Sequence, residues 1–227
     1  MKTIVTDAII LKRIDYSEAD RIITVLTRER GKVQLLAKGI RRSKSKLAGG
    51  LELFSVTNVS YIDGRSDLKT VIGTQLQSFF SIISSDLERT MLGYEFLKLT
   101  NRLTEDESEP IFFELLESAL QSLNDARHSV ALTESWFLLQ LAIASGEGLL
   151  LERTLSGAQF SNDDMYRFDA EEMGFTSHNS GIYSPKHIRL LRLLAKASKP
   201  EMMLKVQGSE ELLIDLAALL KLIHNIG

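Results

Sequence analysis

The residues with the clearest chemistry are eight cationic side chains within residues 28–46. Only one acidic residue, Glu29, lies among them. The eight are Arg28, Arg30, Lys32, Lys38, Arg41, Arg42, Lys44 and Lys46. Cations at this density repel one another unless an anion neutralises them, and the planar guanidinium of arginine binds phosphate oxygens in pairs. The spacing therefore predicts a polyanion as the ligand, with nucleic acid as the first hypothesis.

Two aromatic residues near this run, Phe54 and Tyr61, are candidates to stack on bases. The alternative for each is a core or cross-strand position, and both interpretations stay open. The basic residues also have an ordinary explanation, because charged side chains on an exposed strand discourage aggregation. That explanation accounts for a few lysines, but not for residues 41–46, which hold four cations and no acid.

Residues for catalysis or metal binding form no comparable pattern. The four histidines are scattered and have no His-x-x-x-His or His-Glu spacing. The acidic pairs at 163–164 and 171–172 lack the spacing of an EF-hand, and residues 146–148 lack the third glycine of a dinucleotide loop. The chain has no cysteine, which excludes disulfides and thiolate metal sites. We therefore predict a protein that is not an enzyme and that uses no cofactor and no metal.

The elements that must position the basic run are short strands with alternating apolar residues. We expect strands at residues 3–13, 21–28, 32–38, 51–63 and 68–76. In the third, Val33, Leu35 and Ala37 share one face. Five short strands in about eighty residues predict a small barrel, and an OB-fold is the first expectation. In that fold the face of strands 2 and 3 binds single-stranded nucleic acid, and this face carries Lys32 and Lys38.

After residue 80 the apolar period changes from two to about three and a half, which predicts helices. We expect them at residues 85–103 with a capping box at Ser85, from Pro110, from Ser129 to 145, from Ser184 to 197, and after Ser209. The helix after Ser129 has few polar positions and is expected to be the central, most buried one. The expected domains are 1–80 and 81–227, with an irregular or hairpin-like insertion at about 147–184.

The charge is divided unequally between these parts. The net charge of the chain is −3, but residues 1–80 carry about +6 and residues 81–227 about −9. We therefore expect the two parts to face different partners, or one of them to face a partner and the other open solvent. The N-terminus has no signal-peptide pattern, and the apolar run at 136–144 is too short to span a bilayer. A soluble, cytoplasmic protein is expected.

Three patches resemble the N-terminal domain of the recombination mediator family RecO. They are residues 16–22 (YSEADRI), 26–33 (LTRERGKV) and 37–42 (AKGIRR), followed by Ser45 and Leu51. The resemblance implies an OB-fold with a helical C-terminal domain, binding of single- and double-stranded DNA, and annealing of complementary strands. It also implies loading of RecA onto strands coated by single-strand-binding protein, together with RecR, in the bacterial cytoplasm and at the nucleoid when active.

Many members of that family carry a four-cysteine zinc hairpin in the helical domain. The corresponding stretch here, about 148–187, has Tyr183, Ser184 and Lys186 where the second thiolate pair is expected, so we predict no zinc. One expected helix carries four cations that could bind an acidic protein tail, such as that of single-strand-binding protein, or more DNA. They are Lys186, Arg189, Arg192 and Lys196. The alternative for that helix is a solvated face.

Two other classes of function remain open. An RNA-binding module would use the same barrel, and competition between DNA and RNA of one sequence distinguishes it because only a reader of the 2′-hydroxyl prefers RNA strongly. A protein adaptor would bind no nucleic acid at physiological salt, and charge reversal at Arg41 and Arg42 would leave its activity intact.

Overall fold

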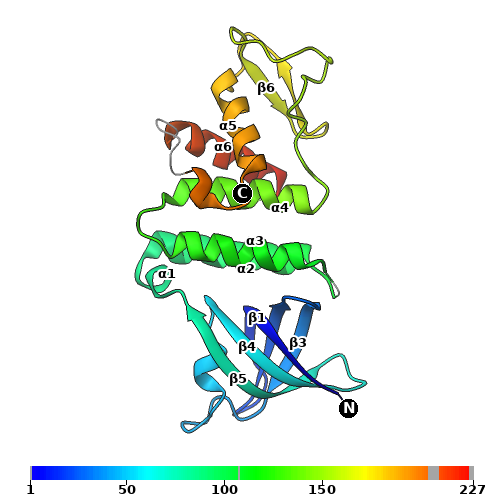
Figure 1. Ribbon diagram of the computed structural model, residues 1–227, viewed down its shortest axis with the longest axis vertical. Helices are drawn as coiled ribbons and strands as arrows, with labels where there is room; N and C mark the ends of the chain where they lie inside the picture. Colours follow the sequence, from blue (N-terminus) through cyan, green and yellow to red (C-terminus); the bar gives the residue numbers. More distant parts are fainter. Residues whose placement is uncertain (1, 107, 204–209, 225–227) are drawn as a thin grey trace. The chain divides into compact units, whose positions relative to one another are not determined.

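The computed structural model describes residues 2–106, 108–203 and 210–224 (Figure 1). The chain forms two compact units, Met1–Asp125 and Ala126–Gly227. No helix in the described part of the chain is long and apolar enough to cross a membrane.

The first unit begins with five strands that close into a barrel in the order β1-β2-β3-β5-β4. They are β1 (Lys2–Asp15), β2 (Arg21–Thr27), β3 (Gly31–Ala37), β4 (Ser55–Asp63) and β5 (Lys69–Phe79). All neighbouring pairs are antiparallel except β3 and β5, which are parallel over a short contact. The five expected strands are confirmed. The fourth begins four residues later than expected because Phe54 has a positive φ of 57°, which interrupts an extended chain.

The barrel interior is apolar, and its residues follow the expected alternation. Leu35 and Ala37 of β3 are fully buried, and Val33 packs against the same core. Ile10 of β1 and Val25 of β2 meet them from the neighbouring strands. The polar residues of β3 therefore face away from this core, which leaves Lys32 outside it.

Three helices complete the first unit: α1 (Ser81–Ser85), α2 (Leu87–Leu103) and α3 (Pro110–Leu123). The expected cap at Ser85 is wrong by one residue, since Asp86 accepts a hydrogen bond from Arg89 N at 2.9 Å. Ser85 instead ends the short helix α1. The change from strands to helices falls near the expected residue 80, but the compact unit continues to Asp125 because α2 and α3 pack on β1 and β2.

The second unit is mainly helical, with α4 (Val130–Ala144), α5 (Pro185–Lys196), the 3-10 helix η2 (Pro200–Met203) and α6 (Glu210–Ile223). Ser129 caps α4 as expected, accepting a hydrogen bond from Leu132 N at 3.0 Å. Helix α4 is buried along most of its length and packs on α5 and α6, which confirms its expected central position. The expected cap of α6 at Ser209 lies outside the described residues.

Between α4 and α5 the chain forms a small antiparallel hairpin, β6 (Tyr166–Asp169) and β7 (Gly174–Ser177). The isolated aromatics of this segment meet in one cluster: the Phe175 ring lies 5.3 Å from Phe168 and 5.7 Å from Tyr183. Burial raises the pKa of Tyr166 and Tyr183. The described residues contain no group of three or more His, Asp or Glu placed to hold a metal ion. Packed aromatic rings, edge to face between Phe175 and Tyr183, form the interior of this hairpin.

Candidate nucleic-acid interface

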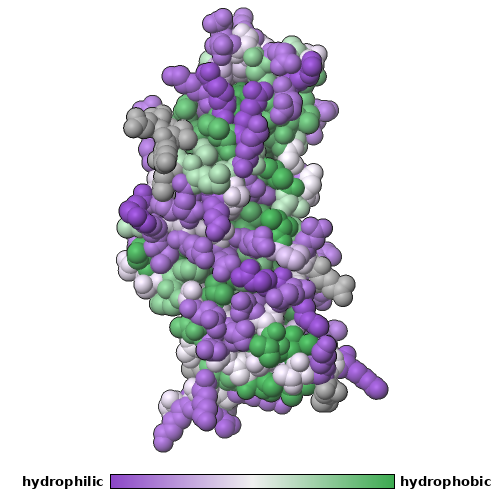
Figure 2. All heavy atoms as spheres, viewed as in Figure 1, coloured by the Kyte–Doolittle hydropathy of each residue, from purple (hydrophilic) through white to green (hydrophobic). Residues whose placement is uncertain are grey.

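The connection from β3 to β4 starts with a strongly cationic stretch, residues 38–46, which we call the basic loop. All five of its cations are exposed. They are Lys38, Arg41, Arg42, Lys44 and Lys46. Two apolar side chains hold the loop on the barrel, since Ile40 is 4% exposed and Leu47 packs against the barrel core. Figure 2 shows hydrophilic side chains projecting at the lower left, where Figure 1 shows the β3–β4 connection.

The basic loop is fastened to the β1–β2 loop, residues 16–20. Gly39 N donates to the Asp20 carboxylate at 2.7 Å, and Arg41 N donates to Ala19 O at 3.0 Å. The Arg41 guanidinium also donates to Ser17 O at 3.2 Å. Gly39 has a φ of 67°, a conformation that glycine adopts without a steric penalty. The two loops therefore form one surface, with the cations on its exposed side.

Most of the charge on this surface has no acidic partner in the part of the chain that the structure describes. Within the described residues, Lys38, Arg42, Lys44 and Lys46 have no acidic group at ion-pair distance. Arg41 alone has one, at 3.5 Å from the Asp15 carboxylate. A hydrogen bond from Arg21, with the charge of Arg41 added, keeps the pKa of Asp15 below its usual value. An anion that reaches this surface meets four unpaired cations and one shared cation.

The remaining basic candidates lie at the other end of β3, and the protein itself uses them. Arg28 pairs with Glu117 of α3 at 3.0 Å and lies 4.3 Å from the centre of the Phe113 ring. Lys32 donates its ammonium hydrogens to Asn101 O at 3.0 Å and to Thr104 O. These carbonyls end α2, where the helix dipole favours a cation. Arg28 and Lys32 therefore hold the helices against the barrel.

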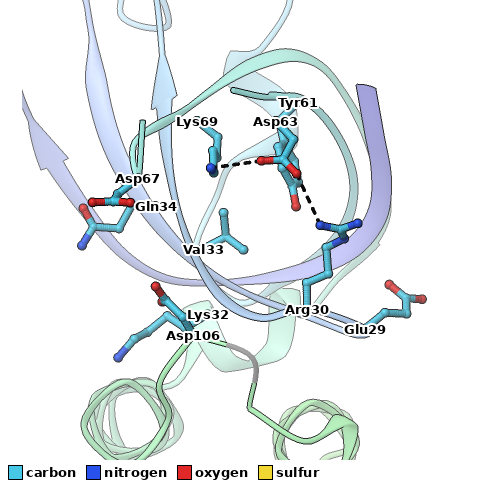
Figure 3. Close-up of a pocket in the computed structure, with 10 residues that line it drawn as sticks. All are labelled: Glu29, Arg30, Lys32, Val33, Gln34, Tyr61, Asp63, Asp67, Lys69 and Asp106. Atoms are coloured by element: carbon cyan, nitrogen blue, oxygen red, sulfur yellow. Dashed lines mark ion pairs between the residues drawn. The ribbon is translucent and has the colours of Figure 1, made fainter. Parts of the chain in front are cut away.

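Arg30 belongs to an open pocket of about 920 Å³ on the same side of the barrel (Figure 3). Asp63 lies between two of its cations, 3.0 Å from the Lys69 ammonium and 3.5 Å from the Arg30 guanidinium (Figure 3). The Lys69 hydrogen bond lowers the pKa of Asp63, and the charge of Arg30 lowers it further. Four carboxylates and three cations line the pocket, so its charge does not select a polyanion.

The two aromatic candidates occupy core positions and cannot stack on a base. Tyr61 is 1% exposed inside the barrel, and burial raises its pKa. Phe54 is 3% exposed and lies edge to face with Tyr94 at 5.1 Å. It packs so closely on α2 that a Cβ at Gly93 would lie 2.8 Å from its ring. For both Phe54 and Tyr61 the structure supports the core position and not the base-stacking position.

On α5 of the second unit, the four candidate cations divide into two kinds. Lys186, Arg189 and Lys196 are exposed. Arg192 instead turns towards its own unit, where it donates to Leu151 O at 2.8 Å and lies 5.2 Å from the centre of the Phe160 ring. Three side chains thus remain available to an acidic ligand, while Arg192 holds the segment that precedes the hairpin.

Comparison with known proteins covers both units. The family described as "Recombination protein O N terminal" matches residues 1–80, and "Recombination protein O C terminal" matches residues 84–225. The chain is 31% identical to a DNA repair protein RecO from Halalkalibacterium halodurans, over 84% of this chain and 74% of the relative. It is 38% identical to those of Myxococcus xanthus and Dehalococcoides mccartyi, over 52% and 62% of this chain. In the last two cases the match spans about half of the relative, 49% and 55%.

Proposed function

The chain belongs to the RecO family of DNA repair proteins, and we propose that it acts as a recombination mediator. In this role it binds single- and double-stranded DNA, anneals complementary strands and, with RecR, loads RecA onto strands coated by single-strand-binding protein. It performs no bond-breaking chemistry. The observation that carries the DNA-binding step is the basic loop, where four of five exposed cations lack an acidic partner among the described residues.

We infer that the barrel is an OB-fold. The strand order β1-β2-β3-β5-β4, with β3 and β5 as its parallel pair, supports this assignment. OB-folds bind oligonucleotides on the face of strands 2 and 3 and on the adjoining loops. Lys38 follows β3 directly, and the β1–β2 loop is bonded to the basic loop. The exposed cations therefore adjoin the part of the fold that such a ligand would occupy.

Charge neutralisation gives a mechanism for annealing. Two complementary strands repel each other through their phosphates, and a cationic surface that contacts both lowers this repulsion. Lys38, Arg41 and Arg42 would contact one backbone, and Lys44 and Lys46 lie further along the same loop. Side chains that remain solvated and flexible suit this task because they hold phosphates without fixing a sequence.

The protein partners are proposed for the second part of the chain. Residues 81–227 carry a net charge of about −9, so long-range repulsion keeps this part from competing for DNA. Lys186, Arg189 and Lys196 on α5 are an exception, and they suit the acidic C-terminal tail of single-strand-binding protein. RecR is the second proposed partner.

The test is binding of a labelled single-stranded oligonucleotide over a series of salt concentrations. Wild type should lose affinity with a log–log slope of about 0.7 for each phosphate contact. Arg42→Glu and Lys44→Glu should each lower both the affinity and this slope. Lys98→Glu on α2 changes the charge of the chain equally and serves as the control, because Lys98 is exposed away from the loop.

The possible results separate the classes of function. Wild type without salt-dependent binding would mean that the basic loop is only a solvated surface, as in a protein adaptor. Strong preference for RNA over DNA of the same sequence would indicate an RNA-binding module. Specific cleavage of labelled DNA in the presence of a divalent metal would contradict a non-enzymatic mediator.

A further inference from the structure

Tyr16, on the β1–β2 loop, is the most exposed aromatic residue in the described part of the chain. Its exposed fraction is 61%, against 49% for Tyr94 and 46% for Phe79. The other large aromatic side chains are at least partly buried, and Trp136 is completely so. An exposed aromatic ring offers a flat face on which a nucleobase can stack.

The loop that carries Tyr16 is ordered by its own hydrogen bonds. Tyr16 N donates to Asp20 O at 3.1 Å, and Asp20 N donates to Ser17 Oγ at 3.3 Å. The strand ladder resumes directly outside this turn, where Asp15 pairs with Arg21. The ring is therefore presented by a closed turn, which limits the conformational entropy that a ligand would have to remove.

Both sequence neighbours of Tyr16 contact the basic loop. The Arg41 guanidinium lies 3.5 Å from the Asp15 carboxylate and 3.2 Å from Ser17 O. Tyr16 therefore lies between two residues that both contact Arg41, which is itself a candidate for binding phosphate. A strand whose phosphate binds Arg41 would therefore lie beside the turn that carries the ring.

We propose that Tyr16 stacks on an unpaired base of a single strand whose phosphates contact the basic loop. This inference rests on the DNA-binding function proposed above, and it adds a preference for single-stranded over duplex DNA. In a duplex the bases are already stacked and paired, so the ring gains little there. The cations bind both forms of DNA, and Tyr16 adds affinity for the single-stranded form.

Three acidic residues lie on this turn, and none cancels the effect. The Asp20 carboxylate already accepts a hydrogen bond from Gly39 N at 2.7 Å. Asp15 is already held by Arg21 at 2.7 Å and by Arg41. Glu18 is exposed and repels phosphate, so it favours a pose in which the base, and not the backbone, covers the turn. Base stacking has no charge requirement and tolerates this neighbour.

The experiment compares Tyr16→Ala, Tyr16→Phe and wild type on single-stranded DNA, on duplex DNA and on a single strand with abasic sites. Tyr16→Ala should weaken single-strand binding by roughly 5- to 150-fold, the range for loss of one stacked base. The salt slope should stay unchanged, since no phosphate contact is removed. Affinity for the duplex and for the abasic strand should change less than twofold. Tyr16→Phe should behave as wild type, and Leu87→Ala, an exposed apolar site on α2, is the matched control.

The readouts keep this inference separate from the proposed function. Wild-type binding with the expected salt slope but no loss in Tyr16→Ala overturns the stacking and leaves the DNA-binding function intact. Equal losses on single-stranded, duplex and abasic DNA also overturn it, as does a loss in Tyr16→Phe, which would assign the effect to the hydroxyl. Wild type without any DNA binding overturns both proposals. Circular dichroism of each variant verifies the fold independently.

Discussion

At the scale of single residues, position on the barrel decides what a cation does. Lys32 and Lys38 lie at opposite ends of β3, and sequence alone treats them alike. Lys32 binds the carbonyls that end α2, whereas Lys38 is exposed and has no acidic partner among the described residues. The same residue type therefore stabilises the fold at one end and faces solvent at the other.

Replacement of Lys32 should reveal this structural task. Lys32→Met keeps the length of the side chain but removes the hydrogen bonds to Asn101 O and Thr104 O. We expect a loss of about 1–3 kcal/mol in the free energy of unfolding, the usual worth of hydrogen bonds from a charged donor. Urea denaturation measures it, with Lys98→Met as the exposed control. A large fall in DNA affinity with unchanged stability would mean that Lys32 binds DNA and does not stabilise the fold.

Asp15 makes stability depend on pH in a defined direction. Its pKa in the folded protein is lowered below the usual 3.8 by the Arg21 hydrogen bond, followed by the charge of Arg41. A lowered pKa in the folded state stabilises the protein above pH 3.8, and this contribution disappears as the pH falls through the folded-state pKa. At pH 6 wild type should therefore have a higher melting temperature than Asp15→Asn, and the two melting temperatures should converge near pH 2. A constant difference over this range would contradict the assignment.

At the scale of elements, the barrel and α2 fit together because one helical residue has no side chain. Gly93 of α2 lies against Phe54, the residue whose positive φ precedes β4. An added Cβ would approach the Phe54 ring to 2.8 Å and Ile83 to 3.2 Å. This close contact joins the end of the β3–β4 connection to α2.

Gly93→Ala is therefore expected to destabilise the first unit although alanine is the better helix former. Overpacking of this kind destabilises a protein by about 1–3 kcal/mol. The higher helix propensity of alanine stabilises by only about 1 kcal/mol, so the net effect is a loss of stability or, at the lower limit, no change. Thermal unfolding measures the net effect, with Met91→Ala at an exposed site of α2 as the control. A clear rise in melting temperature would show that Phe54 moves without cost.

At the scale of the whole molecule, the charges are divided between parts with different proposed partners. Residues 1–80 carry about +6 and residues 81–227 about −9, although the total is only −3. The exposed cations of α5 form a basic group within this acidic part. An acidic peptide and DNA should therefore bind to separate surfaces.

A double charge reversal tests this separation. Lys186→Glu/Arg189→Glu should weaken binding of a synthetic acidic peptide with the sequence of the C-terminal tail of single-strand-binding protein, and the loss should shrink as salt rises. The salt slope for single-stranded DNA should be that of wild type, because the basic loop is intact. The reverse pattern is expected for Arg42→Glu. A parallel loss of both ligands in either variant would contradict two separate surfaces.

The sequence by itself determined much of this protein. Alternating apolar residues fixed five strands, because a one-residue shift would turn residues such as Leu35 and Ala37 out of the core. Local signals fixed helix starts at Pro110 and after Ser129, since a cap acts within one turn. The density of cations in residues 28–46 also predicted a charged surface, and the five cations in residues 38–46 are exposed.

Only the tertiary structure decided which candidates are available to a ligand. Phe54 and Tyr61 lie in the core. The side chains of Arg28, Lys32 and Arg192 donate hydrogen bonds to groups that are 40 or more residues distant in sequence. Tyr16 had no alternating pattern around it, so no local signal marked its ring as exposed beside Arg41. Burial and pairing depend on contacts between distant segments, and periodicity within one segment carries no information about them.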